Sequence, residues 1–217
     1  MSHQKRIPAP KHYPIKRKEN TYISTIKGSR SKDNAIPVVV FLRDVLEYAE
    51  TEKEAKQIVE NGDVKRNGDT VKDIKEGVGI LDVVEIPETE EMFRAVRRGK
   101  YLEFIPVEDS KVAAKIEDKD VKGDRFIYRL HSGENYSTKD EYSTGNTLVF
   151  EDDTVSEVVL EEGADALVIK GKHAGDVAEV KEINDEGMQN TAIIENDREF
   201  ETELENLVAV EDLEVER

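Results

Sequence analysis

The pattern of hydrophobic and polar positions changes near residue 37. Residues 1–36 show no sustained helical or strand period and are interrupted by prolines, so we expect an extended arm instead of a domain. From Pro37, apolar residues recur at spacings of three and four, which predicts an amphipathic helix over residues 37–50. Thr51 and Glu54 then fit a capping box that opens a second helix, and Asn61-Gly62 ends it.

Shorter apolar runs with turn residues between them follow the two helices. Short strands are expected near Val64 and Val71, on either side of a tight turn at Asn67-Gly68, and a buried strand is expected over residues 80–86. Residues 101–165 contain five strand-length runs, and further runs occupy residues 166–196. The predicted fold class is α+β, mainly β, with several small domains.

Composition agrees with several small domains. Hydrophobic residues make up 37% of the 217 positions and charged residues another 37%, so one deep core is not expected. The chain has no cysteine, which excludes disulfides and cysteine-based metal sites. Its longest apolar run, residues 37–42, is too short to cross a bilayer, and no secretory signal is recognisable. We expect a soluble intracellular protein.

The net charge of −17 is unevenly distributed. Residues 1–36 hold nine lysines or arginines against Glu19 and Asp33, a net +7, so the remainder carries −24. A basic arm on an acidic body suggests one segment that faces a polyanion. The acidic body itself has two explanations: a charge-repelling interaction protein, or a halophilic protein kept soluble by surface carboxylates in molar salt.

The arm mixes cations with Tyr13 and Tyr22. Flexible basic arms of this kind order against phosphates and stack on unpaired bases, although an ordinary disordered tail would have the same composition. The candidate RNA-binding residues of the arm are Lys5, Arg6, Lys11, His12, Lys16, Arg17, Lys18, Lys27, Arg30 and Lys32.

The run EAKQIVENGDVKRNGDTV, within residues 37–86, resembles the S4 RNA-binding fold. The resemblance implies two helices and a loop that present basic side chains to an RNA backbone; a generic two-helix cap is the alternative. MFRAVRRGKY, at residues 92–101, would extend this surface, unless it is a linker whose arginines pair with Glu88, Glu90 and Glu91. The candidate residues are Arg43, Lys53, Lys56, Lys65, Arg66, Arg94, Arg97, Arg98 and Lys100, with turns at Gly62 and Gly68.

ALVIKGKHAGDVAEVKEI, from residue 166 to residue 183, is similar to a KOW motif. Gly171 and Gly175 would allow the tight loop between two alternating strands, with Val168 and Val177 facing the interior. An ordinary hairpin loop is the alternative reading. The candidate RNA-binding residues of this loop are Lys170, Lys172 and His173.

The order of these segments, from about residue 4 to residue 210, resembles the small-subunit ribosomal protein S4e family of archaea and eukaryotes. The resemblance implies a structural constituent of the 30S subunit that binds ribosomal RNA and neighbouring ribosomal proteins. It also implies an arm (1–36), an S4-like module with a basic extension (37–100), a central β domain (101–165) and an SH3-like KOW barrel with an acidic end (166–217). Most such proteins are basic, and a halophilic archaeal source would reconcile the acidity of this chain.

Catalysis finds no support in the pattern. The four histidines lack metal-ligand spacing, and neither a nucleophile elbow nor an NTPase phosphate loop occurs. We therefore expect no enzyme activity, cofactor, metal, membrane contact or small-molecule substrate, and a place in the cytoplasmic ribosome. The alternatives are a KOW-containing transcription elongation factor and an RNA-modifying enzyme that carries an S4-like module.

Overall fold

A computed structural model describes residues 4–151, 154–184, 190–211 and 213–215. The chain forms two compact units. The N-terminal unit contains Met1–Val96 and Lys100–Ser110, and the C-terminal unit contains Arg97–Gly99 and Lys111–Arg217. The chain is mostly β with few helices, which confirms the coarse fold class.

The predicted arm is packed into the N-terminal unit instead of extending freely. Ala9, Tyr13, Ile23 and Ile26 are buried, although they follow no helical or strand period. Single apolar residues between prolines give no periodic signal, so the pattern could not reveal this packing. The arm's two short strands, β1 (Gln4–Lys5) and β2 (Tyr22–Ile23), pair with each other in antiparallel register.

The first helix is shorter than predicted and has no polar face at its start. α1 (Val38–Val40) continues into the π-helical turn η1 (Phe41–Val45), and the chain leaves the helix at Glu47, where φ is 58°. Phe41 is buried against Phe93 and Phe104, with ring centroids 6.0 and 4.5 Å apart. Because both sides of this short helix are covered, its apolar residues do not form a single stripe.

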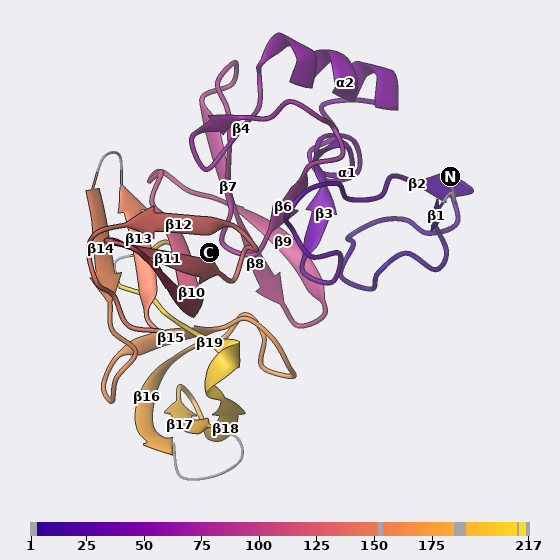
Figure 1. The fold of residues 1–217 in the computed structure, drawn as a ribbon. Helices are drawn as coiled ribbons and strands as arrows, with labels where there is room; N and C mark the ends of the chain where they lie inside the picture. The colour runs from indigo at the N-terminus through magenta and orange to yellow at the C-terminus, as the bar shows by residue number, and fades with distance from the viewer. Residues whose placement is uncertain (1–3, 152–153, 185–189, 212, 216–217) are drawn as a thin grey trace. The chain divides into compact units, whose positions relative to one another are not determined.

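The second helix and the turn after it follow the prediction. In α2 (Glu52–Asn61, near the top of Figure 1), the Thr51 side chain accepts from the Glu54 N–H, and Gly62 ends the helix in the left-handed conformation. Asn67 and Gly68 both have positive φ, as a two-residue hairpin turn requires. The paired strands are β4 (Lys65–Arg66) and β5 (Asp69–Thr70).

One five-stranded sheet, in the order β5-β4-β7-β8-β9, supports the N-terminal unit. The basic run at residues 92–101 forms strand β8 and the start of β9, so the alternative of a linker there is wrong. The predicted strand over residues 80–86 is also shorter, because Leu81 has φ 66°. The remaining bounds are β3 (Ala35–Pro37), β6 (Gly77–Gly79), β7 (Val83–Ile86), β8 (Glu91–Arg98) and β9 (Tyr101–Pro106); β3 pairs with β6.

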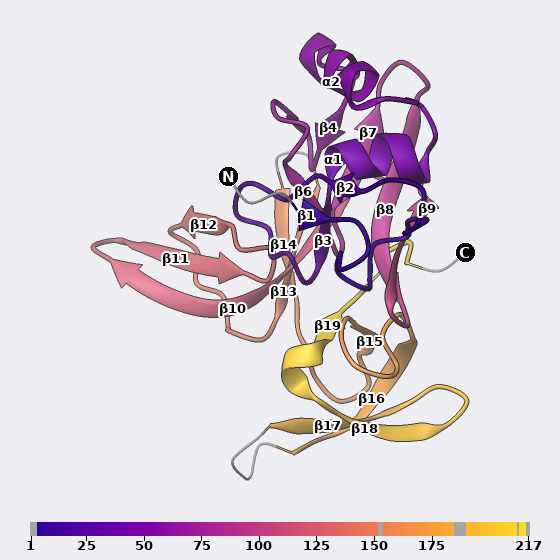
Figure 2. The same cartoon turned by 90° about the vertical axis from the view of Figure 1, so that its right-hand side faces the viewer.

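The C-terminal unit begins with a sheet in the order β12-β11-β10-β13-β14. Its long β10–β11 hairpin is seen side-on in Figure 2. A core of Ala114, Ile116, Tyr128, Leu130 and Leu148 lies on one face. The polar strand β12 was not predicted, because it lies at the sheet edge and has no apolar run. The bounds are β10 (Val112–Lys122), β11 (Arg125–Leu130), β12 (Asn135–Thr138), β13 (Thr147–Glu151) and β14 (Thr154–Val158).

The second sheet of this unit has the order β18-β17-β16-β15-β19. Within the described residues its hydrogen bonds do not close into a ring, since β18 and β19 are the two edges. Val168 and Val180 are in its core, and Val177 is half-buried. The bounds are β15 (Asp165–Val168), β16 (Val177–Asn184), β17 (Thr191–Glu195), β18 (Glu199–Glu203), the 3₁₀ turn η2 (Leu204–Asn206) and β19 (Leu207–Ala209).

Candidate nucleic-acid interface

The arginines of the arm point inward. Arg6 is 1% exposed; its Nη2 lies 2.5 Å from Asp44 Oδ1, and its Nε donates to the Lys16 carbonyl at 2.7 Å. Arg17 donates to the carbonyls of Ala9 (2.6 Å) and Pro10 (2.8 Å). A guanidinium suits this task because its planar fork reaches several acceptors at once. Both side chains therefore brace the arm.

Arg30 is anchored by a buried carboxylate. Its Nε and Nη2 donate to the two carboxylate oxygens of Asp82 at 2.8 and 2.6 Å, and both side chains are 3% exposed. The Gly79 N–H and Asn67 Nδ2 also donate to this carboxylate, each at 2.7 Å. Burial opposes ionisation of Asp82, but the Arg30 charge and the hydrogen bonds from Arg30 and Gly79 outweigh it, so the pKa of Asp82 lies below its ordinary value.

His12 is also enclosed. Its Nε2 lies 2.9 Å from the Ala35 carbonyl, and its ring meets Tyr13 edge-on at 4.9 Å. Tyr13 is buried as well, whereas Tyr22, the other arm tyrosine, is 58% exposed. Of the two tyrosines of the arm, Tyr22 is therefore the one that lies on the surface.

The lysines of the arm lie on the surface. Lys27 pairs with Asp73 at 2.9 Å, and the Lys16 ammonium is 3.6 Å from Glu19 with both side chains mostly in solvent. Solvated pairs of this kind contribute little free energy, so these lysines can exchange partners. Within the described part of the chain, the exposed arm lysines that make no ion pair are Lys5, Lys11, Lys18 and Lys32.

The basic residues of the helical module also include both exposed side chains and side chains held by protein partners. Lys53 and Lys56 are exposed on α2, and Lys56 pairs with the equally exposed Glu60 at 3.3 Å. The turn residues are more constrained: Lys65 pairs with Glu85 at 3.2 Å, and Arg66 donates to the Gly77 carbonyl at 2.8 Å. Arg43 is half-buried and pairs with Asp44 at 2.8 Å.

The basic residues of the cluster at residues 94–100 differ in how far they are buried. Arg94 is fully buried and pairs with Asp109 at 2.6 Å, a partner outside the run of glutamates just before the strand. Arg97 and Arg98 are half-buried. Lys100 is exposed, with its ammonium 5.2 Å from the centre of the Tyr101 ring. Three consecutive residues, Arg94 to Val96, are buried, and exposure then increases through Arg98 to Lys100, so position along the strand and not the alternation of its faces explains this division.

The KOW-type loop is organised by contacts inside the C-terminal unit. The His173 ring stacks on Phe200 at 3.9 Å, and His173 Nδ1 lies 3.3 Å from Asp176. Gly175 lies against the backbone of Arg97, where a β-carbon would come within 2.0 Å of the carbonyl oxygen. Lys172 is exposed, Lys170 is half-buried, and the Gly171 turn has φ 92°.

Two exposed cations of the N-terminal unit were absent from the predicted set. Lys72 and Lys75 follow the β4–β5 hairpin. The sequence signal for them is the charged run KDIKE, but this run has two basic and two acidic residues and therefore does not stand out as a basic segment.

The net charge of the chain is also unevenly distributed between its two parts: residues 1–110 hold 20 basic and 20 acidic residues, and residues 111–217 hold 12 basic and 29 acidic residues. The negative excess thus lies entirely after Ser110.

The described residues contain no cluster of three histidine or acidic side chains that could hold a metal ion. No helix in this described part is long and apolar enough to span a bilayer.

The KOW motif family matches residues 162–195. The chain is 32% identical to "Small ribosomal subunit protein eS4" of Halobacterium salinarum, over 97% of this chain and 96% of that protein. It is 33% identical to the protein of the same name from Methanothermobacter thermautotrophicus, over 89% and 84%. The crystal structure of the 30S ribosomal protein S4e from Thermoplasma acidophilum matches with a TM-score of 0.68 and 25% identity, over 82% of this chain and 95% of that one.

Proposed function

Because the chain belongs to the eS4 family of small ribosomal subunit proteins, we propose that its exposed lysines hold ribosomal RNA while the arginines of the arm hold the arm in shape. Membership makes the protein a structural constituent of the small subunit, a cytoplasmic particle, and not an enzyme. Its partners are ribosomal RNA and other ribosomal proteins. The elongation-factor and RNA-modifying-enzyme alternatives are not favoured.

The division between arginine and lysine in the arm carries the proposal. Arg6, Arg17 and Arg30 donate to protein acceptors, and His12 is enclosed. An ammonium on a flexible stem in solvent can meet a phosphate without breaking a structural contact. The proposed phosphate contacts are Lys5, Lys11, Lys16, Lys18, Lys32, Lys53, Lys56 and Lys100, all exposed in the structure.

The neutral balance of residues 1–110 supports this assignment. RNA meets less repulsion there than beside residues 111–217, where acidic residues outnumber basic ones by 17. We propose the loop Lys170–Gly175 as a second, smaller contact through Lys172, with Lys170 and His173 beside it. Arg43, Lys65, Arg66, Arg97 and Arg98 would contribute charge without being the main contacts. Buried Arg94 would have a structural role through its pair with Asp109. Lys27, whose pair with Asp73 is exposed, would be a further surface contact.

We propose the finer domain division as four functional segments: the arm (1–36), the S4-like module (37–100), the central β domain (101–165) and the KOW domain (166–217). An SH3-like barrel in the last segment is supported by five antiparallel strands, a 3₁₀ turn before the final strand, and the β-bulge between Val180 and Glu182.

Binding of a small-subunit rRNA transcript by the full chain, measured across KCl concentrations, tests the lysine assignment. We expect Lys11→Gln with Lys18→Gln to weaken binding and to reduce the slope of log affinity against log salt by about 1.5, since each lost phosphate contact is worth about 0.7 to 0.9. The matched control is Lys122→Gln with Lys139→Gln, which removes the same charge from exposed positions of the C-terminal unit. Equal slopes for the two variants would contradict the proposal.

Point substitutions are preferable to deletion of residues 1–36. The arm supplies buried residues such as Tyr13 and Arg30 to the N-terminal unit, so its deletion would also remove part of the core. Sucrose-gradient sedimentation of the lysine variant then reports incorporation separately from folding. We expect lower occupancy in the 30S fraction, with the control variant at the wild-type level.

A further inference from the structure

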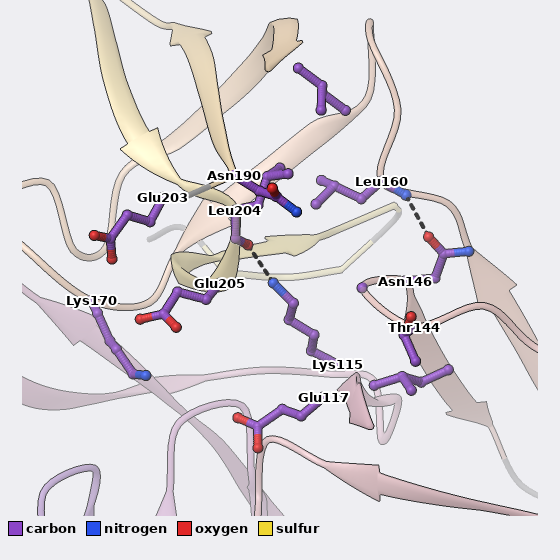
Figure 3. Close-up of a pocket in the computed structure, with 13 residues that line it drawn as sticks. Lys115, Glu117, Thr144, Asn146, Leu160, Lys170, Asn190, Glu203, Leu204 and Glu205 are labelled. Carbon is purple, nitrogen blue, oxygen red and sulfur yellow. Dashed lines mark hydrogen bonds between the residues drawn. The ribbon is translucent and has the colours of Figure 1, made fainter. Parts of the chain in front are cut away.

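A polar cleft of about 1050 Å³ lies inside the C-terminal unit, and one buried lysine crosses it (Figure 3). Lys115, from β10 of the first sheet, is 5% exposed. Its Nζ donates to the Leu204 carbonyl at 2.5 Å and to the Leu207 carbonyl at 2.6 Å, acceptors that follow it by 89 and 92 residues. These carbonyls belong to η2 and β19, so a single side chain joins the two sheets.

The acceptors lie next to the base of the KOW-type loop. Leu207 is paired with Val168 at the end of β15, and the Ile169 N–H donates to the Asn206 carbonyl at 2.8 Å. Lys170 comes directly afterwards and lines the same cleft. The path from the Lys115 ammonium to the loop therefore passes through two consecutive backbone contacts.

The base of the Lys115 side chain is itself fixed. Its N–H donates to His131 Nδ1 at 3.1 Å, and its carbonyl accepts from the His131 N–H at 2.9 Å. The strand changes partners here, since β10 pairs with β13 up to Lys115 and with β11 from Ile116. The ammonium therefore projects from a backbone that is held on both sides.

Burial of this ammonium is unfavourable in itself. Desolvation lowers the pKa of Lys115 to about 8, against the opposing charges of Glu117 and Glu205. An apolar side chain of similar length would fill the space without this cost. An apolar side chain, however, cannot form directional hydrogen bonds. The Lys115 amine can donate to both the Leu204 and Leu207 carbonyls, even when it is neutral.

We propose that Lys115 is a positioning residue, which fixes the loop Lys170–Gly175 relative to the first sheet of the C-terminal unit and so sets how that loop meets ribosomal RNA. The part of this statement that concerns RNA rests on the proposed function; the part that concerns the loop stands on the contacts alone.

Amide hydrogen exchange of the full chain, without RNA, tests the positioning. In Lys115→Met, which keeps length and apolar volume, we expect the Ile169 and Leu207 amides to exchange at least about tenfold faster, because local opening there becomes easier. The control is Lys122→Met, the same substitution on the exposed end of β10. Wild-type exchange at Ile169 and Leu207 in a folded Lys115→Met protein would overturn the proposal.

Two further measurements keep the proposal testable if Lys115→Met does not fold. Lys115→Arg retains donors for both carbonyls, so we expect protection near the wild-type level; a folded arginine variant that lost it would overturn the assignment. In the wild type, nitrogen NMR of the lysine side chains should find Lys115 titrating well below the ordinary pKa of 10.5 for a solvated lysine. Titration at that ordinary pKa would mean that Lys115 is solvated and not inserted.

A double-mutant cycle with the rRNA transcript tests the functional part. If Lys115 acts through the loop, Lys115→Met should weaken binding about threefold or more in the wild type, and should add nothing once Lys170→Gln and Lys172→Gln are present. Additive losses would overturn this route. If the loop variant alone left affinity unchanged, the proposed RNA contact would fail, while the exchange result would still decide the positioning.

Discussion

Arg30 and Asp82, separated by 52 residues in the sequence, form a bidentate ion pair in the interior of the N-terminal unit. One partner comes from the basic arm and the other from the turn before β7. Gly77 allows the pair to form, because a β-carbon at that position would lie 2.7 Å from the Arg30 β-carbon. A residue predicted to meet RNA thus connects the arm to the module.

Removing one partner of this pair should cost much of the stability of the unit. We expect Arg30→Met to lower the free energy of unfolding by about 3–5 kcal/mol, because the Asp82 carboxylate remains buried without its counter-charge. Urea unfolding measures the loss. Lys27→Met, which breaks the exposed pair with Asp73, is the control and should cost less than about 1 kcal/mol. Similar losses in both variants would contradict the structural role of Arg30.

The Lys115 ammonium predicts a rise of stability with pH. Its pKa is about 8 in the folded chain, against an ordinary value of 10.5 for a solvated lysine, so the unfolded chain binds more protons between these values. The contribution of this group is complete above pH 10.5 and is lost as the pH falls through 8. The difference between the two pKa values corresponds to about 3 kcal/mol.

Unfolding of wild type and Lys115→Met, compared from pH 7.5 to about 10, isolates this contribution from other groups that titrate in the same range. Glu117, Glu205 and Lys170 are the charged groups that act on Lys115, and all three are unchanged in the variant. The stability difference between the two proteins should change in favour of the wild type as the pH rises. A constant difference would contradict the lowered pKa.

Two glycines of the KOW-type loop should respond very differently to alanine. Both have positive φ, 92° at Gly171 and 100° at Gly175, so each substitution costs about 1–2 kcal/mol of backbone strain. Only at Gly175 would the added methyl also meet the Arg97 carbonyl, at 2.0 Å. Thermal unfolding should therefore find Gly175→Ala less stable than Gly171→Ala by more than about 1 kcal/mol. Equal melting temperatures would exclude the close approach.

Salt should stabilise the chain. Residues 111–217 carry 12 basic and 29 acidic residues, so self-repulsion opposes folding of the C-terminal unit at low ionic strength. At about 1 M salt the Debye length falls to about 3 Å, which screens all but the nearest charges. The melting temperature should rise as KCl increases from 0.1 to about 2 M. A melting temperature independent of KCl would count against the halophilic explanation of the acidity.

Local signals in the sequence were sufficient for the parts of the fold that local chemistry decides. The Thr51–Glu54 capping box, the left-handed end at Gly62 and the Asn67-Gly68 turn are all present, because each depends on neighbours within a few residues. The strand runs at residues 125–130 and 191–195 were also found, because their apolar residues recur at the strand spacing. The order of the motifs along the chain was enough to identify the family.

The tertiary structure alone decided which cations face solvent. The sequence does not indicate that Arg30 is buried and Lys32 exposed, or that Arg94 is buried and Lys100 exposed. The carboxylates that pair with the two arginines, Asp82 and Asp109, are distant or unremarkable in the sequence. The same holds for Lys115, whose first acceptor lies 89 residues away. Charge and period are properties of the chain, whereas burial and partner choice depend on which segments meet in space. For this reason one basic run in the sequence supplies both arginines that donate to protein acceptors and lysines that lie on the surface.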